Sequence, residues 1–264
     1  MSESLGPSEA AMNKLPQITL AFWVMKICAT TLGETAGDLL SMTLNIGYAL
    51  SSLLLISLFI LSLLGQLSSR RYTPALYWTV ILMTSTAGTT MSDFMDRTLG
   101  LGYASGSLIL VSMLVSVLLV WRLSEKSLSV EHIVSRRAEL FYWAAILLSN
   151  TLGTALGDYL ADDSGLGFAG GALLIGSLLA VVAVAYYRTQ LSRVALFWIA
   201  FVLTRPFGAT LGDVLTKSTE KGGLDLGTVG SSAVLFATLA VLVCFAIWAQ
   251  QQRSAPMAIR TEQR

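Results

Sequence analysis

A single motif occurs four times in this chain of 264 residues. Each copy contains a tryptophan, a glycine ten residues later, and an aspartate fifteen residues after the tryptophan that directly follows a glycine or serine. The tryptophans are Trp23, Trp78, Trp143 and Trp198, and the aspartates are Asp38, Asp93, Asp158 and Asp213. Such regular self-similarity indicates tandem copies of one supersecondary unit. The chain must therefore fold as four similar units that pack on one another.

Composition indicates that these units lie in a membrane. Hydrophobic residues make up 54% of the chain and charged residues only 12%, a balance typical of multi-pass membrane proteins. Segments of about 20 apolar residues can cross a bilayer. The candidate segments are 18–40, 47–64, 74–94, 102–121, 138–160, 166–187, 194–215 and 229–249. The sequence predicts an all-α integral membrane protein with eight transmembrane helices.

Each unit contains two of these helices, so all four units enter the membrane in the same direction. The spacings between successive aspartates are 55, 65 and 55 residues, which favours either pseudo-fourfold symmetry or two doubled halves. The predicted fold is four tandem parallel helical hairpins, with a tail at 1–17, a membrane domain at 18–250 and a tail at 251–264. Within the membrane domain, the repeats are expected at 18–68, 73–122, 138–189 and 193–250. A further glycine follows the aspartates, at Gly47, Gly102, Gly167 and Gly227.

The distribution of positive charge predicts the orientation. The Lys and Arg residues on the side of the two termini are Lys14, Arg70, Arg71, Arg122, Lys126, Arg136, Arg137, Arg188, Arg193, Arg253, Arg260 and Arg264. Only Arg97, Lys217 and Lys221 fall on the other side. The positive-inside rule then places both termini in the cytoplasm. Residues 1–16 lack the pattern of a cleaved signal peptide, so we expect the first helix to act as an uncleaved anchor.

Several classes of function are disfavoured by composition. The net charge is +1, and no basic patch with interleaved aromatic residues is present, so we expect no nucleic-acid partner. Cys28 and Cys244 are isolated in apolar runs, which fits packing better than a disulfide or a metal–thiolate site. The sequence predicts no cofactor. The expected partners are the lipid bilayer and a small cation, and a homo-oligomer is compatible with the pattern.

The repeat resembles a known family of bacterial multi-pass membrane proteins. That family is built from four tandem repeats, each with two membrane helices and a signature tryptophan. The resemblance extends from Trp23 to about Trp248 and implies the architecture described above, in a bacterial inner (plasma) membrane. The family carries no activity that the resemblance could transfer, so function must be inferred from individual residues.

The aspartates are the leading candidates for a functional site. Fifteen residues of helix span about 22 Å, so each aspartate lies about 8 Å inside the far edge of a hydrocarbon layer of about 30 Å if its tryptophan marks the cytoplasmic interface. A carboxylate near the end of a helix faces the negative end of the helix dipole, which is unfavourable. We therefore expect a cation, a proton or a positioned donor to compensate each aspartate. The structural alternative is a polar rim or a hydrogen bond that stabilises the repeat.

Residues four positions before each aspartate lie on the same helix face. These are Glu34, Thr89 and Thr154 in three repeats, while the fourth has Ala209 and, nearby, Pro206 beside Arg205. The predicted cation-binding residues are Asp38, Asp93, Asp158, Asp213, Glu34, Thr89 and Thr154, with the four aspartates as metal ligands. Carboxylate and hydroxyl stripes on four helices of the same direction could converge on one axis.

The other residues within the helices have two readings each. The small residues predict close helix packing at Gly33, Gly37, Gly88, Gly153, Gly157, Gly208 and Gly212. The tryptophans suit either interfacial anchoring or core packing. Arg205 and Lys26 are candidate gating or counter-charge groups. Either could pair with an acid; Arg205 could fill the acidic site when the substrate leaves, and Lys26 could instead snorkel to the cytoplasm.

Three classes of function fit a membrane protein with this motif to different degrees. The first, which we favour, is a transporter or channel for a small hard cation, expected to be a divalent metal such as Mn²⁺ or Mg²⁺, with proton coupling as an option. Oxygen ligands select hard ions, and parallel repeats are a known transporter architecture. The alternative is a non-transporting membrane scaffold or assembly protein whose Asp and Gly residues are structural. An intramembrane protease needs one unequal pair of acids, which four equivalent aspartates do not provide, so no enzyme is predicted.

Overall fold

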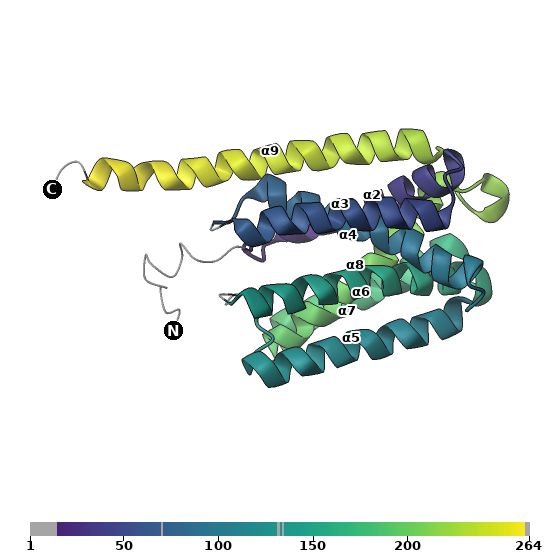
Figure 1. Cartoon of the computed structure of the whole chain (residues 1–264), viewed down its shortest axis with the longest axis horizontal. Coiled ribbons are helices and arrows are strands. Elements are labelled where there is room, and N and C mark those ends of the chain that lie inside the picture. The colour runs from purple at the N-terminus through teal and green to yellow at the C-terminus, as the bar shows by residue number, and fades with distance from the viewer. Residues whose placement is uncertain (1–14, 70, 131–132, 134, 262–264) are drawn as a thin grey trace.

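The computed structural model of the chain describes residues 15–69, 71–130, 133 and 135–261. Over these residues the protein is helical, with eight long α-helices and no strand (Figure 1). The parts of the predicted tails at 1–14 and 262–264 lie outside the described residues, as do Lys14, Arg70 and Arg264 among the positive residues used for orientation. The last helix continues to Thr261, into the segment predicted as the tail 251–264.

The first helix of each repeat lies in an inner ring. The four inner helices are α2 (Leu20–Asp38), α4 (Pro74–Asp93), α6 (Arg136–Asp158) and α8 (Arg193–Thr216). Each inner helix packs against the inner helix of the next repeat, and α8 packs against α2, so the ring is closed. The axis enclosed by this ring is where side chains from all four repeats can meet.

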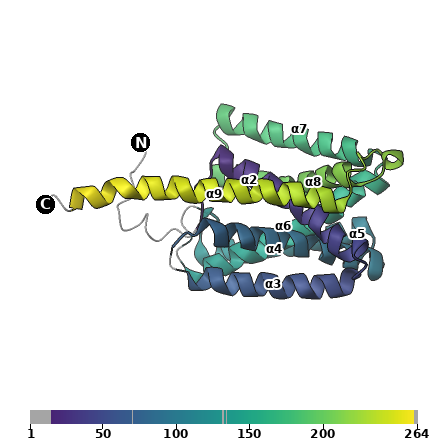
Figure 2. The same ribbon diagram turned by 90° about the horizontal axis from the view of Figure 1, so that it is seen from above.

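The second helix of each repeat lies outside this ring. The outer helices are α3 (Tyr48–Ser68), α5 (Tyr103–Glu125), α7 (Gly167–Arg188) and α9 (Thr228–Thr261). Each outer helix packs on the inner helix of the following repeat: α3 on α4, α5 on α6, α7 on α8, and α9 on α2. Figure 2 shows α3 and α7 on opposite sides of the molecule, with α9 lying across the inner helices. A single repeat therefore cannot bury its own inner helix, and the four depend on one another.

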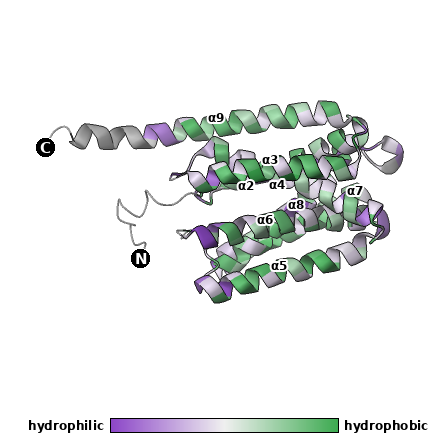
Figure 3. Ribbon diagram, viewed as in Figure 1, coloured by the Kyte–Doolittle hydropathy of each residue, from purple (hydrophilic) through white to green (hydrophobic). Residues whose placement is uncertain are grey.

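Six of the described helices are long and apolar enough to cross a membrane. They are Tyr48–Ser68, Tyr103–Glu125, Arg136–Asp163, Gly167–Arg188, Arg193–Thr216 and Thr228–Gln252. Outer helices such as α5 and α9 are hydrophobic over most of their described length (Figure 3). The sequence predicts eight apolar spans, and these six helices correspond to six of them. The other two, α2 and α4, do not meet the same criterion of length and hydropathy. Both helices are rich in threonine and other polar residues that are buried against neighbouring inner helices, so their composition suits protein contacts more than lipid contacts.

The turn between the two helices of a repeat involves the aspartate of the motif and the further glycine that follows it. In the first three repeats the α-helix ends at the aspartate and continues as one π-helical turn, over Leu39–Thr43, Phe94–Thr98 and Tyr159–Asp163. The glycines that follow have positive φ angles, which are 82° at Gly47, 72° at Gly102, 66° at Gly167 and 71° at Gly227. Side chains other than glycine rarely adopt this conformation. The glycine is therefore required where the chain reverses into the outer helix.

The glycines within the inner helices lie at contacts between neighbouring inner helices. A Cβ atom at Gly33 would overlap the side chain of Ser85, and one at Gly88 would lie 2.9 Å from the backbone of Asn150. The other contacts join Gly37 to Thr89, Gly153 to Arg205, Gly157 to Ala209, Gly208 to Thr30 and Gly212 to Glu34. The small residues thus allow the inner helices to approach closely enough to close the ring.

An aromatic layer packs the ring at the end where α2 begins. In each repeat the tryptophan follows another aromatic residue, which contacts the tryptophan of the next repeat. The ring centroids are 5.7 Å apart for Phe22–Trp78, 5.6 Å for Tyr77–Trp143, 6.4 Å for Tyr142–Trp198 and 5.8 Å for Phe197–Trp23. Trp78, Trp143 and Trp198 are buried, so of the two readings of these tryptophans the structure supports core packing.

Candidate functional site

The four aspartates of the motif lie at the ends of the inner helices, opposite the aromatic layer. Asp38, Asp93 and Asp158 are the last residues of α2, α4 and α6, and Asp213 lies in the last turn of α8. Their exposed fractions are only 2–4%. Buried carboxylates are costly unless they are paired or hydrogen-bonded, so their partners determine what this end of the molecule can do.

Two cations bridge the aspartates in pairs. Arg97 lies 2.9 Å from Asp93 (Nε to Oδ1) and 3.2 Å from Asp158 (Nη2 to Oδ2). Lys217 lies 2.8 Å from Asp38 (Nζ to Oδ2) and 3.2 Å from Asp213 (Nζ to Oδ1). The sequence predicts a cation, a proton or a positioned donor beside each aspartate, and the structure places a cation there in all four cases. The aspartates form two bridged pairs, one from repeats 1 and 4 and one from repeats 2 and 3, in place of a ring of four equivalent ligands.

The bridging cations are only partly enclosed. The side chains of Arg97 and Lys217 are 33% and 23% exposed, and both residues follow the ends of their inner helices. Burial disfavours the charged form of Lys217, but Asp213 and Asp38 outweigh this effect and raise the pKa of Lys217 above its ordinary value. Its ammonium group therefore remains charged and acts as a tethered cation in the acidic site.

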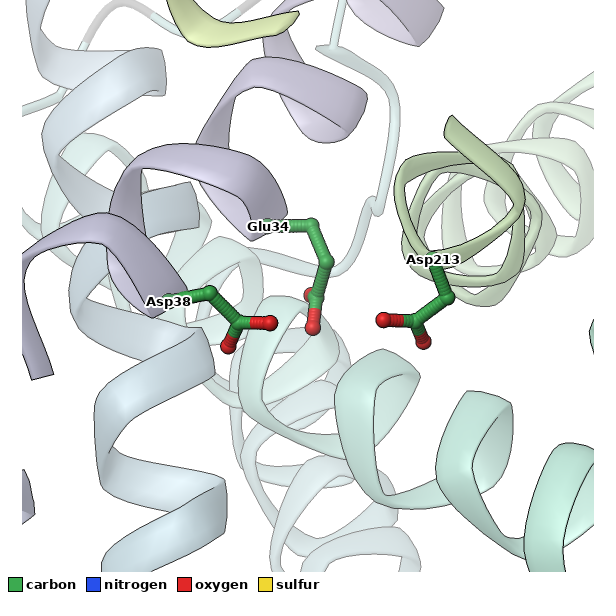
Figure 4. A group of neighbouring side chains, drawn as sticks. All are labelled: Glu34, Asp38 and Asp213. Carbon is green, nitrogen blue, oxygen red and sulfur yellow. The ribbon is translucent and has the colours of Figure 1, made fainter. Parts of the chain in front are cut away.

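Three carboxylates converge closely at the Lys217 side of this end. Glu34, Asp38 and Asp213 each offer one oxygen, and these oxygens all lie within 4.8 Å of one another. Figure 4 shows the three side chains pointing toward one another from α2 and α8. Hard cations bind oxygen ligands at about 2.0–2.6 Å, so one ion could contact all three. Asp93 and Asp158 do not belong to this group.

Glu34 also belongs to a buried network around Arg205. Its Oε2 atom accepts hydrogen bonds from Arg205 Nη1 at 2.9 Å and from the hydroxyls of Thr89 and Thr154 at 3.2 Å each. Arg205 Nη2 also donates to these hydroxyls, at 2.5 Å and 2.7 Å, and to the carbonyl oxygen of Ser85 at 3.3 Å. Arg205 has no exposed surface. The structure thus places both threonines beside Arg205 and Glu34, and it pairs Arg205 with an acid.

Lys26 lies deeper along the axis, toward the aromatic layer. Its side chain is fully buried, and Nζ lies 3.4 Å from Asn150 Oδ1 and 4.0 Å from the centre of the Phe201 ring. The idea that Lys26 snorkels to the cytoplasm is therefore wrong, because the residue faces the interior of the inner ring. Pairing with an acid is not found either: among the described residues, no carboxylate lies within ion-pair distance of its ammonium group.

The sequence reasoning missed both bridging cations. Arg97 and Lys217 were counted only as loop charges that set the orientation. Each lies four residues after an aspartate, the spacing at which oppositely charged side chains on a helix meet. That spacing was the available signal for the contacts within a repeat. The contacts to Asp158 and Asp38 carried no such signal, since they depend on which inner helices are neighbours.

Comparison with protein families identifies the repeated unit. Four segments, at residues 21–72, 76–127, 141–192 and 196–252, match the family model described as Repeat of Unknown Function (DUF347). Each match begins two residues before the tryptophan of the motif. No curated protein and no solved structure gives a significant match. The four units deduced from the motif are thus the four copies of one recognised repeat.

Proposed function

Because the chain belongs to the DUF347 repeat family, which is defined without reference to an activity, we propose a function from the site itself. The protein is a membrane transporter or channel for a small hard cation, with a divalent metal such as Mn²⁺ or Mg²⁺ as the expected substrate. The single observation that carries this proposal is the group of Glu34, Asp38 and Asp213, buried at the end of the inner ring with a tethered ammonium group between two of its members.

The proposal includes a membrane arrangement. The four hairpins span a bacterial inner membrane with both termini in the cytoplasm, so the aspartates lie toward the opposite face. The closed packing of inner helices in repeat order supports a pseudo-fourfold arrangement, and the two bridged aspartate pairs reduce it to a doubled one. The excess of Lys and Arg on the side of the termini supports the orientation.

Charge balance favours a divalent ion. Glu34 and the four aspartates supply five carboxylates, and Arg97, Lys217 and Arg205 are the three cations that pair with them. With these eight groups ionised, five negative and three positive charges leave two negative charges, which one divalent cation would neutralise; Lys26, which pairs with none of the described acids, is outside this count. Intramembrane acids are costly and are functional candidates for that reason.

Binding at this site would proceed by exchange of one cation for another. An incoming ion takes the oxygens of Glu34, Asp38 and Asp213, and the ammonium group of Lys217 moves away from Asp38 and Asp213. Lys217 is suited to this exchange because its side chain is partly exposed, and it returns to neutralise the site after the ion leaves. Arg97 keeps Asp93 and Asp158 together throughout.

Thermal stability of the purified protein tests ion binding directly. We expect stabilisation by one of Mg²⁺, Mn²⁺, Ca²⁺ or Na⁺ that increases with the logarithm of the ion concentration and reaches about 2.7 kcal/mol at one hundred times the dissociation constant. The effect should be lost in Asp38→Asn and kept in Asp163→Asn, since Asp163 is exposed at the same end of the molecule.

A membrane scaffold is the second candidate, and the pairing of all four aspartates with internal cations favours it. If the scaffold function is correct, no ion in this panel stabilises the protein, and Asp38→Asn responds to the panel as the wild type does. That result would contradict the transport proposal.

A further inference from the structure

Lys26 is a buried ionisable group for which the proposed cation site has no use. It has no exposed surface, and its closest polar contact is the neutral amide oxygen of Asn150 at 3.4 Å. Burying an ion costs several kcal/mol even after the protein relaxes, and among the described residues no carboxylate lies within ion-pair distance of Lys26 to offset that cost. Arg97, Arg205 and Lys217 each pair with a carboxylate, so the charge of Lys26 is the least compensated of the four.

The repeats show that this lysine is not required for packing. Lys26 lies twelve residues before Asp38, and the corresponding residues in the other repeats are Ile81, Ile146 and Phe201. All three are as fully buried as Lys26. An apolar side chain therefore fills this level of the inner ring in three repeats, and only the first repeat places an amine there.

The surroundings connect Lys26 electrostatically to the cation site. From α8, the Phe201 ring lies 4.0 Å from Lys26 Nζ, and Arg205 follows one helical turn later as the nearby charged group. Glu34 lies two turns further along α2. From α6 and α4 the contacts are neutral, because Asn150 accepts from Lys26 and donates to Thr84 at 3.0 Å. The outer helix α9 contributes no acidic or basic residue over 228–252. Glu34 pairs with Arg205 and also belongs to the set of three carboxylates with Asp38 and Asp213. It therefore links the surroundings of Lys26 to the cation site.

Resting on the proposed function, we propose that Lys26 is the proton-binding group that couples cation binding at the site to the release of one proton. When a divalent cation takes the charge of Glu34, Arg205 loses part of its counter-charge. A second buried cation beside Arg205 then becomes less favourable, and the Lys26 ammonium group releases one proton to water.

A proton that leaves Lys26 toward the end where α2 begins would pass two buried hydroxyls. The hydroxyls of Tyr77 and Tyr142 lie 2.6 Å apart within the aromatic layer, at the level of Phe22, one helical turn from Lys26. Both are buried and can donate or accept a hydrogen bond. By linkage the coupling is reciprocal, so protonation of Lys26 weakens cation binding to the same extent that cation binding favours loss of the proton.

Proton release on cation binding tests the coupling. MnCl₂ is added to the purified full-length protein in weak buffer with a pH-sensitive dye, and Mn²⁺ binding is followed in parallel by thermal stability. Lys26→Ile inserts the residue found at this level in two other repeats, and Lys26→Arg keeps the positive charge but cannot lose a proton. We expect each variant to release about one proton fewer per bound ion than the wild type. Lys26→Ile should keep stabilisation by Mn²⁺, whereas Lys26→Arg should need a higher Mn²⁺ concentration for the same stabilisation, because its charge is permanent.

Equal proton release in the wild type and both variants would overturn the assignment of Lys26. A wild type that Mn²⁺ stabilises without any proton release would overturn the coupling while leaving the cation site intact. A wild type that Mn²⁺ does not stabilise would contradict the proposed cation site first, and the coupling with it.

A measurement without added ions tests proton exchange at Lys26 itself. Thermal stability of the wild type and of Lys26→Ile is compared between about pH 5 and 9. If Lys26 changes its protonation in the folded protein over this range, the difference in stability changes with pH, by up to about tenfold in the folding equilibrium constant per pH unit. Ile146→Val is the matched control at the same level, and its difference should stay constant. A constant difference for Lys26→Ile as well would overturn the proposal.

Discussion

At the scale of single residues, Arg205 and Glu34 form an ion pair inside the inner ring. Arg205 makes four hydrogen bonds to residues of α2, α4 and α6, so one side chain of the fourth repeat joins the other three. This arrangement is compatible with burial only because the donors are directed at a carboxylate, two hydroxyls and a carbonyl oxygen. Removing either partner leaves the other charge buried without its counter-charge.

We therefore predict that Arg205→Gln destabilises the protein by about 3–5 kcal/mol, the usual cost of breaking a buried ion pair. Arg205→Lys should not restore stability, because one ammonium group cannot reproduce the planar arrangement of guanidinium donors. The double variant Arg205→Gln with Glu34→Gln should recover part of the loss. The coupling is measured by denaturation of the wild type, Arg205→Gln, Glu34→Gln and the double variant. Additive effects of the two single substitutions would show that the pair does not act as a unit.

At the scale of helices, the contacts between inner helices depend on small residues at fixed positions. Each glycine ten residues after a tryptophan faces the next inner helix around the ring. These positions were predictable from the sequence, because glycine spacing within an apolar helix is typical of close helix packing. Their partners were not, since the neighbour of each helix is set by the closed ring and by outer helices that pack on the following repeat.

Gly88→Ala should be destabilising by about 1–3 kcal/mol, the usual cost of overpacking. The added methyl group would lie 2.9 Å from backbone atoms of Asn150 and Thr151, and a backbone cannot move aside as a flexible side chain can. Gly230→Ala is the matched control, because no atom lies within 4 Å of a Cβ placed there. It should be neutral or stabilising, by up to about 1 kcal/mol, since alanine favours helix over glycine. Comparable destabilisation in the two variants, measured by thermal unfolding, would argue against the packing role of Gly88.

At the scale of the whole molecule, four copies of one hairpin build a ring in which each copy completes the next. The motif was sufficient to predict the number of repeats, the helical class and the positions of the buried acids. It did not reveal that the polar residues of α2 and α4 are buried against neighbouring inner helices, because the sequence alone does not show which faces avoid lipid. Nor did it show that Arg97 and Lys217 divide the aspartates into pairs, since each bridge joins different repeats.

Lys217 bridges the first and fourth repeats, and it is the group that the incoming ion displaces in the proposed exchange of cations. Replacing it with methionine removes the tethered charge from Asp38 and Asp213. We predict that Lys217→Met binds the stabilising ion more tightly than the wild type, because the ion no longer competes with the ammonium group, while the ion-free variant is less stable. Titration of thermal stability with the ion gives both quantities. Unchanged affinity would show that Lys217 does not occupy the ion's position.

The most direct test of the central claim is Mn²⁺ uptake by sealed lipid vesicles that contain the purified protein, followed with an internal Mn²⁺-sensitive dye. The account predicts faster uptake than in protein-free vesicles for the wild type and for Asp163→Asn, and loss of that increase in Asp38→Asn. Uptake by the wild type no faster than in protein-free vesicles, or equal uptake by Asp38→Asn and the wild type, would contradict transport of Mn²⁺ through the site formed by Glu34, Asp38 and Asp213.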